Sequence, residues 1–199
     1  AESDAPIDLS GIDPTILKTI ADTSEDSTVL PNDTTTEDTP VAIGEVVTYR
    51  LAVTMPEGIS KNVEIADVVP AGMQYVPGSA VLKTTSLDGY DDLDGTIGNL
   101  QTTASGNDLT FGFDADVVVT GNNRLEDNTF HGEYETIVLN DAGNQDGSSP
   151  TEFIETARLT LDDPSGHPIR DDSGNPFESN AVRAIATEPQ LSVKTYVFD

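Results

Sequence analysis

The ten residues "EVVTYRLAVT", 45–54, alternate polar and apolar side chains along most of their length. Val47, Tyr49, Leu51 and Val53 share one parity, so they would line one face of an extended strand. A helix would instead need apolar residues spaced three and four apart. This stretch therefore predicts a β-strand with one face in the core.

The same two-residue alternation recurs along most of the chain, whereas helical periodicity is nearly absent. The other segments expected as strands are VEIADVV (63–69), SAVLKTTS (79–86), DLTFGF (108–113), ADVVVT (115–120), YETIVLN (134–140), FIETARLTL (153–161) and NAVRAIATE (180–188). Clusters of Gly, Pro, Asn and Asp separate them, as turns do. The expected fold class is therefore all-β, an immunoglobulin-like sandwich with Greek-key connections and long acidic loops.

The chain carries 36 acidic residues against nine basic ones, a formal charge of −27. Such a surface repels phosphate backbones and anionic lipids, which argues against nucleic acid and membrane surfaces as partners. No apolar run approaches the ~20 residues that a membrane helix needs, so membrane insertion is not expected. The absence of cysteine excludes disulfides and thiol chemistry. His131 and His167 stand beside Gly or Pro, and both are expected in surface loops.

Residues 1–188 are expected to form one sandwich module, in which the acidic, Thr-rich segment 21–40 is a long exposed loop or insertion. The last residues, "EPQLSVKTYVFD" (188–199), repeat the order acid, proline, apolar run and Lys-Thr found in "DPTILKTI" (13–20). Residues 189–199 are therefore interpreted as a linker and the first strand of a following module, or as a strand donated to a neighbouring copy.

Several phrases in order, "IGEVVTYRLAVTMPEG", "NVEIADVVPAGMQYVPGSA", "ETIVLNDAGNQDG", "ETARLTL" and "ATEPQLSVKT", resemble the conserved-repeat domain of bacterial surface proteins. That family is related to isopeptide-forming fimbrial domains, and the resemblance runs from about residue 12 onward. It implies immunoglobulin-like modules strung in tandem along adhesins and fibres of the cell surface. An extracellular location and head-to-tail contact with copies of the same module are the corresponding expectations.

Three charged residues share a parity with apolar neighbours: Lys18 on the first strand, Asp67 in "EIADVV" and Glu155 in "FIETARLTL". Buried charges are costly unless they are paired, so the three are expected to form one cluster. The resemblance implies the same grouping, with Lys18 as an amine that attacks an Asn side chain and Asp67 as the catalytic acid.

The sequence departs from the family at the third position, where Glu155 stands in place of the usual Asn. A carboxyl group offers no ammonia as a leaving group, so a salt-bridge cluster without a covalent link is the favoured interpretation. Two alternatives stay open: an isopeptide bond, with Asn180 as the fallback acceptor, and a Lys18 ammonium that lies in water at a sheet edge.

Two loops are candidates for calcium, because hard cations prefer several carboxylates on a Gly-containing loop. Neither matches the spaced acidic pattern of an EF-hand, and the competing interpretation is solvated turns. The candidate ligands are Asp88, Asp91, Asp92 and Asp94 in the first loop, and Asp162, Asp163, Asp171 and Asp172 in the second.

The function favoured by the sequence is non-enzymatic: a load-bearing repeat module of an extracellular fibre or adhesin, joined in tandem or by strand exchange. The alternative is a calcium-dependent adhesive module that binds a cell-surface glycan or protein. A hydrolase on a β-sandwich is less favoured, because the aromatic residues that stack on sugars are scarce, with five Tyr, six Phe and no Trp.

Overall fold

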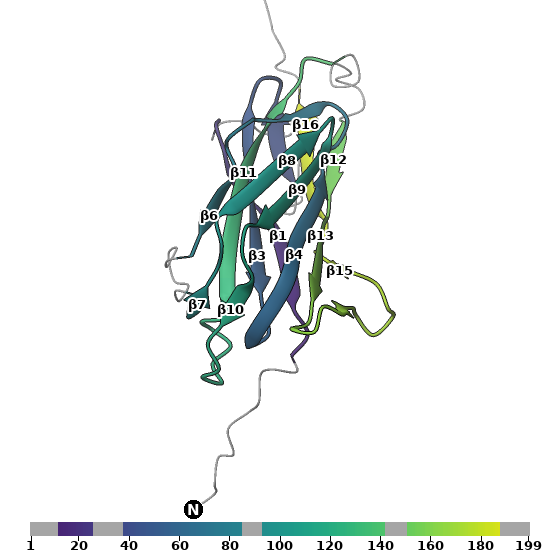
Figure 1. The fold of residues 1–199 in the computed structure, drawn as a ribbon. Coiled ribbons are helices and arrows are strands. Elements are labelled where there is room, and N and C mark those ends of the chain that lie inside the picture. Colours follow the sequence, from purple (N-terminus) through teal and green to yellow (C-terminus); the bar gives the residue numbers. More distant parts are fainter. Residues whose placement is uncertain (1–11, 26–37, 85–92, 142–150, 188–199) are drawn as a thin grey trace, which may run out of the picture.

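The computed structural model describes residues 12–25, 38–84, 93–141 and 151–187. These residues form strands arranged in three sheets, and none of them is helical (Figure 1). In the described part of the chain, therefore, no helix is available that could span a membrane. The all-β fold class expected from the alternation is confirmed.

The first sheet has the order β1-β3-β11-β5, with β6 also paired to β11. Its strands are β1 (Thr15–Thr23), β3 (Val46–Thr54), β5 (Met73–Tyr75), β6 (Val81–Lys83) and β11 (Thr129–Val138). Both β1 and β11 run antiparallel to β3, and the four apolar residues predicted to share a face of 45–54 are all buried. The stretch that predicted the fold is thus the central strand of this sheet.

The second sheet is built on the long strand β4 (Gly58–Val68), which pairs with β13 along one edge and with β9 and β10 along the other. Its remaining strands are β7 (Gly95–Thr96), β8 (Leu100–Ser105), β9 (Asp108–Phe113), β10 (Val117–Val119), β13 (Ala157–Asp162), β14 (Pro168–Ile169) and β15 (Phe177–Glu178). The inner faces of the first and second sheets enclose one hydrophobic core.

The third sheet has the order β12-β16-β2 and consists of β12 (Glu152–Glu155), β16 (Val182–Thr187) and β2 (Thr39–Ala42). The segment 153–161, expected as one strand, is therefore two strands in different sheets, and the chain crosses between them at Thr156. Both ends of the expected loop 21–40 lie in strands, β1 and β2, while residues 26–37 lie outside the described residues.

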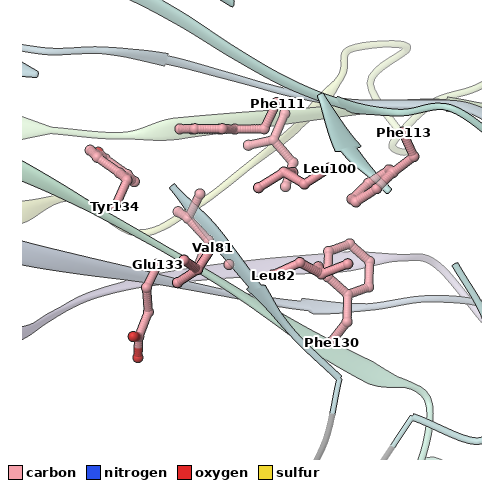
Figure 2. Close-up of a pocket in the computed structure, with 11 residues that line it drawn as sticks. Val81, Leu82, Leu100, Phe111, Phe113, Phe130, Glu133 and Tyr134 are labelled. Carbon is pink, nitrogen blue, oxygen red and sulfur yellow. The ribbon is translucent and has the colours of Figure 1, made fainter. Parts of the chain in front are cut away.

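A small cavity of about 10 Å³ remains between the first two sheets, beneath β6 and β8. Figure 2 shows aromatic rings and leucines gathered around it, while the Glu133 carboxylate points away. Its wall is apolar and its volume is at most that of one water molecule, so it does not provide a ligand site.

The described chain enters the sandwich at one end and leaves it at the other. In Figure 1 the start of β1 lies at the bottom of the molecule, whereas β16 runs upward and ends at the top. The segment 189–199, interpreted from the sequence as the start of a next module, lies outside the described residues.

Candidate functional site

Lys18 lies in the middle of β1, and its side chain enters the core between the sheets. It has the same parity as Ile16, which is also buried, and the strand register places it opposite Leu51 of β3. The Lys18 side chain has no exposed surface (0 %). The alternative of an ammonium group in water is therefore wrong, because alternation along β1 directs this side chain inward.

Three oxygen atoms surround the Lys18 ammonium group. Nζ lies 2.7 Å from Asp67 Oδ2, 2.6 Å from Glu155 Oε2 and 2.8 Å from the hydroxyl oxygen of Tyr134. Three acceptors match the three N–H donors of an ammonium group. The structure thus brings together the three charged residues singled out in the sequence, with all three side chains fully buried.

The crossing of the chain between sheets explains how the two carboxyl groups meet. Glu155 is the last residue of β12, where it pairs with Val182, and two residues later Ala157 pairs with Asp67 of β4. Both carboxyl side chains therefore project into the same part of the core, where they meet the side chain of Lys18 from β1.

Tyr134 of β11 completes the cluster, and the sequence analysis did not single it out. Its hydroxyl donates to Asp67 Oδ2 at 2.7 Å, and its ring stacks on Tyr49 with centroids 5.4 Å apart. Lys18 Nζ lies 4.6 Å from the centroid of the Tyr49 ring, within the range of a cation–π interaction. The ammonium group therefore has the Tyr134 hydroxyl as a hydrogen-bond acceptor on one side and the aromatic face of Tyr49 on another.

The cluster would carry one net negative charge if both carboxyl groups were ionised. Burial raises the pKa of Glu155, the negative charge of Asp67 adds to this, and the positive charge of Lys18 opposes it. Glu155 Oε1 accepts no hydrogen bond from the described residues, whereas Asp67 Oδ1 accepts one from the main-chain N–H of Val68 at 2.9 Å. Burial and the nearby Asp67 carboxylate therefore favour the neutral form of Glu155, whereas the ammonium group of Lys18 favours its ionised form.

The same geometry bears on covalent chemistry. An amide bond between Lys18 and Glu155 would require a neutral amine with a lone pair to attack the carboxyl carbon. Three acceptor oxygens within hydrogen-bond distance instead favour the ammonium form, which has no lone pair. The described contacts fit an ionic cluster better than a site of condensation.

Asn180 does not reach the Lys18 amine. Its side-chain Oδ1 accepts a hydrogen bond from the main-chain N–H of Lys18 at 2.9 Å. Its Nδ2 donates a hydrogen bond to the main-chain carbonyl of the same lysine at 3.0 Å. A side-chain amide has the donor and acceptor that match a peptide group, so Asn180 binds the outer edge of β1. The Asn180 side chain therefore contacts the main chain of Lys18 and not its amine, and its role as fallback acceptor stays a prediction.

Two of the four acidic residues of the second predicted calcium loop stabilise turns. Asp163 Oδ1 accepts from the main-chain N–H groups two and four residues further on, at 2.7 and 2.9 Å. Asp171 makes the same pair of bonds, at 2.9 and 2.7 Å. Asp162 accepts from the side chain of Asn62, and Asp172 lies in the second of these turns.

In the first predicted loop, only Asp94 is among the described residues, and its carboxylate accepts from Asn122 at 3.0 Å. Asp88, Asp91 and Asp92 lie outside them. Within the described ranges, no group of three acidic or histidine side chains converges on a common point. Calcium binding at either loop thus stays a prediction.

The prediction that both histidines lie on surface loops is right for His167 and wrong for His131. His131 lies within β11, where it pairs with Ala52 of β3 and Lys83 of β6, and its side chain is buried on the face opposite to Phe130 and Tyr134. Burial lowers the pKa of His131, as do the positive charges of Arg50 and Lys83 against the opposing charge of Glu133.

Neither a protein-family model nor a curated protein sequence matches the chain. Solved structures do. BcpA, the major pilin subunit of Bacillus cereus, aligns with a TM-score of 0.55 and 17 % identity over 88 % of this chain and 41 % of the pilin. The T6 backbone pilin of serotype M6 Streptococcus pyogenes aligns with a TM-score of 0.51 and 16 % identity over 86 % of this chain and 36 % of the pilin.

The chain spans less than half the length of either pilin, so it corresponds to a part of each. At such low identity the likeness concerns the fold and not the residues of a site. What the sheets, the core and these alignments establish together is that the chain has the β-sandwich fold found within Gram-positive pilin subunits.

Proposed function

We propose that this chain is a load-bearing structural module of an extracellular surface fibre or adhesin. The observation that carries the proposal is the buried Lys18 cluster, which joins strands from all three sheets. Lys18 comes from β1 and Tyr134 from β11 of the first sheet, Asp67 from β4 of the second and Glu155 from β12 of the third.

The cluster acts by making separation of β1 costly. A buried ion pair adds little to stability compared with a well-packed apolar core, but leaving one buried charge without its partner costs about 3–5 kcal/mol. Pulling β1 out of the sandwich would leave two carboxyl groups in the core without their ammonium partner. The first strand is thus held by buried ion pairs, which water does not reach while the strand stays in the sandwich.

The direction of the chain supports head-to-tail assembly. Because the described chain enters at one end of the sandwich and leaves at the other, modules joined in series would transmit tension along the sandwich (Figure 1). The partners in this proposal are neighbouring copies of the same module. The fold likeness to pilin domains supports a location on the cell surface.

Force spectroscopy on a tandem array of the chain tests the proposal. Lys18→Met should lower the unfolding force markedly, because it removes the ammonium group that joins the sheets. Arg158→Met is the matched control, since it breaks an ion pair whose partners are both more than half exposed (56 % and 59 %) and which contributes little. Equal unfolding forces for Lys18→Met and the wild type would contradict a load-bearing role for the cluster.

Intact mass separates the ionic cluster from a covalent bond. Condensation of Lys18 with Glu155 would release one water molecule and lower the mass by about 18 Da. We expect the unshifted mass for the wild-type chain. A deficit of about 18 Da that disappears in Glu155→Gln, or becomes about 17 Da through loss of ammonia, would show that the strands are joined covalently.

A further inference from the structure

Among the described residues, strand β8 has an open edge, and its side chains are exposed on both faces. Within the described structure it pairs only with β9, in a regular register from Leu100 opposite Phe113 to Ser105 opposite Asp108. Residues 101–105 are all exposed, although they alternate between the two faces of the sheet. Leu100 alone is anchored, at the wall of the small apolar cavity (Figure 2).

The hairpin geometry tells which main-chain groups face outward. Residues 106 and 107 form a two-residue turn, and the closing pair of such a hairpin exchanges its hydrogen bonds. The main-chain groups of Ser105, Thr103 and Gln101 therefore face β9. The main-chain groups of Leu100, Thr102 and Ala104 face the open edge, where they could form hydrogen bonds with a further strand.

The edge also lacks the features that keep strands apart. Residues 95–107 contain no charged side chain in a chain of net charge −27, and β8 contains no proline and no bulge. Exposed edges are normally protected by charges, prolines, bulges or short length. In a molecule this acidic, a second copy can approach most closely where charge is absent.

The other described edges are less suitable for pairing. Asn180 occupies the outer edge of β1 at Lys18, and β5, β6, β7, β14 and β15 are two or three residues long. β12 has four residues and begins with the exposed Glu152, and β2, the other edge strand of its sheet, also has four residues and contains Pro40. β8, by contrast, is six residues long and carries no charged side chain.

We propose that β8 is a lateral interface at which two copies of this chain pair edge to edge in antiparallel orientation. A twofold axis at Thr102 would pair this residue with itself in the other copy, and Leu100 of each copy with Ala104 of the other. All the outward main-chain groups of the strand are then used, because the outward positions are symmetric about Thr102. The contact is isologous and closes after two copies.

The pairing is weak between two isolated modules and gains strength in arrays. A single six-residue edge buries far less than the ~1,000 Å² of a specific stable interface. Repeated along two fibres, such contacts would add through effective concentration. This inference therefore goes beyond the proposed mechanical function and describes how fibres would join side by side.

Sedimentation velocity of the chain, at concentrations up to the order of millimolar, tests the interface. A dimer should appear and should increase as NaCl is raised from about 0.05 M to 1 M, because salt screens the repulsion between the acidic copies. Thr102→Pro and Ala104→Pro remove outward N–H groups that β9 does not use, so each should weaken dimerisation at least about tenfold. Thr102→Val, which keeps the main-chain donor, should dimerise like the wild type.

Thermal melting first establishes that each proline variant is folded. A wild-type chain that stays monomeric at every salt concentration overturns the proposal. So do two folded proline variants that dimerise like the wild type, since association would then use another surface. The force measurements on a tandem array report on the Lys18 cluster within one module, so the two proposals fail independently.

Discussion

The side-chain amide of Asn180 hydrogen-bonds both main-chain groups of Lys18, 162 positions away in the sequence. It occupies the place that a neighbouring strand would take at the outer edge of β1. With β3 paired along the other edge, the segment of β1 that carries the buried ammonium group is held from both sides. We expect the position of Nζ among its three acceptors to depend on this support.

Asn180→Ala should lower the free energy of unfolding by about 1–3 kcal/mol, because two main-chain groups of Lys18 lose their partner. Asn180→Asp has nearly the same shape but places a carboxylate oxygen against the Lys18 carbonyl, so it should be destabilised at neutral pH and should recover on acidification. Urea denaturation at pH 7 and pH 4 measures both variants. Unchanged stability of Asn180→Ala would show that the amide does not support β1.

Lys18→Met should lower the free energy of unfolding by about 3–5 kcal/mol, because Asp67 and Glu155 lose their cation inside the core. Replacing all three residues, as Lys18→Met with Asp67→Asn and Glu155→Gln, should recover most of this loss. Chemical denaturation compares the variants, and the triple variant keeps the test decisive if the single variant does not fold. A triple variant no more stable than Lys18→Met would mean that steric packing and not charge governs the site.

Glu155 should make the stability depend on pH in an unusual direction for a carboxyl group. Burial raises the pKa of Glu155 above the ordinary 4.5, so the folded state binds this proton more tightly than the unfolded state. The stability that the neutral group contributes is complete below pH 4.5 and is lost as the pH rises through the folded pKa. The difference in unfolding free energy between the wild type and Glu155→Gln, measured against pH, should therefore decrease across this range. A difference that stays constant would show that Glu155 is ionised in both states.

Calcium should raise the melting temperature if the loop at residues 88–94 is a binding site, because a ligand that binds the folded state stabilises it. The comparison is between calcium and a chelator, with Asp94→Asn expected to reduce the shift. Asp171→Asn is the matched control, since that carboxylate already accepts two main-chain N–H groups in a turn. Identical midpoints in calcium and chelator would remove calcium from the description of this protein.

Alternation alone located the cluster because each of its three charged residues lies on an otherwise apolar stripe. Lys18 and Asp67 are in regular strands, so their parity is a reliable guide to their direction. Tyr134 follows the same rule in "YETIVLN", where its parity matches that of the buried Val138. A tyrosine carries its polar group at the tip of an apolar ring, so parity gave no sign that it would join a polar site.

Other features could not be read from local pattern. The separation of β12 from β13 leaves the alternation unbroken, because the chain changes sheets without changing the direction of its side chains. β8 has no alternation to detect, since both of its faces are exposed. His131 beside Gly132 resembles a turn in sequence, and only the pairing of β11 with β3 and β6 shows it to be strand.

The entry of the chain at one end of the sandwich and its exit at the other determine how tension would load the hydrogen bonds. Force applied at the start of β1 and at the end of β16 would run nearly along these two strands, and so in shear across their ladders with β3, β12 and β2 (Figure 1). Bonds loaded in this shear direction share the force and must break together, whereas bonds peeled from one end would break one at a time. If the proposed mechanical function is right, we expect the sandwich to unfold abruptly, at high force, and not gradually.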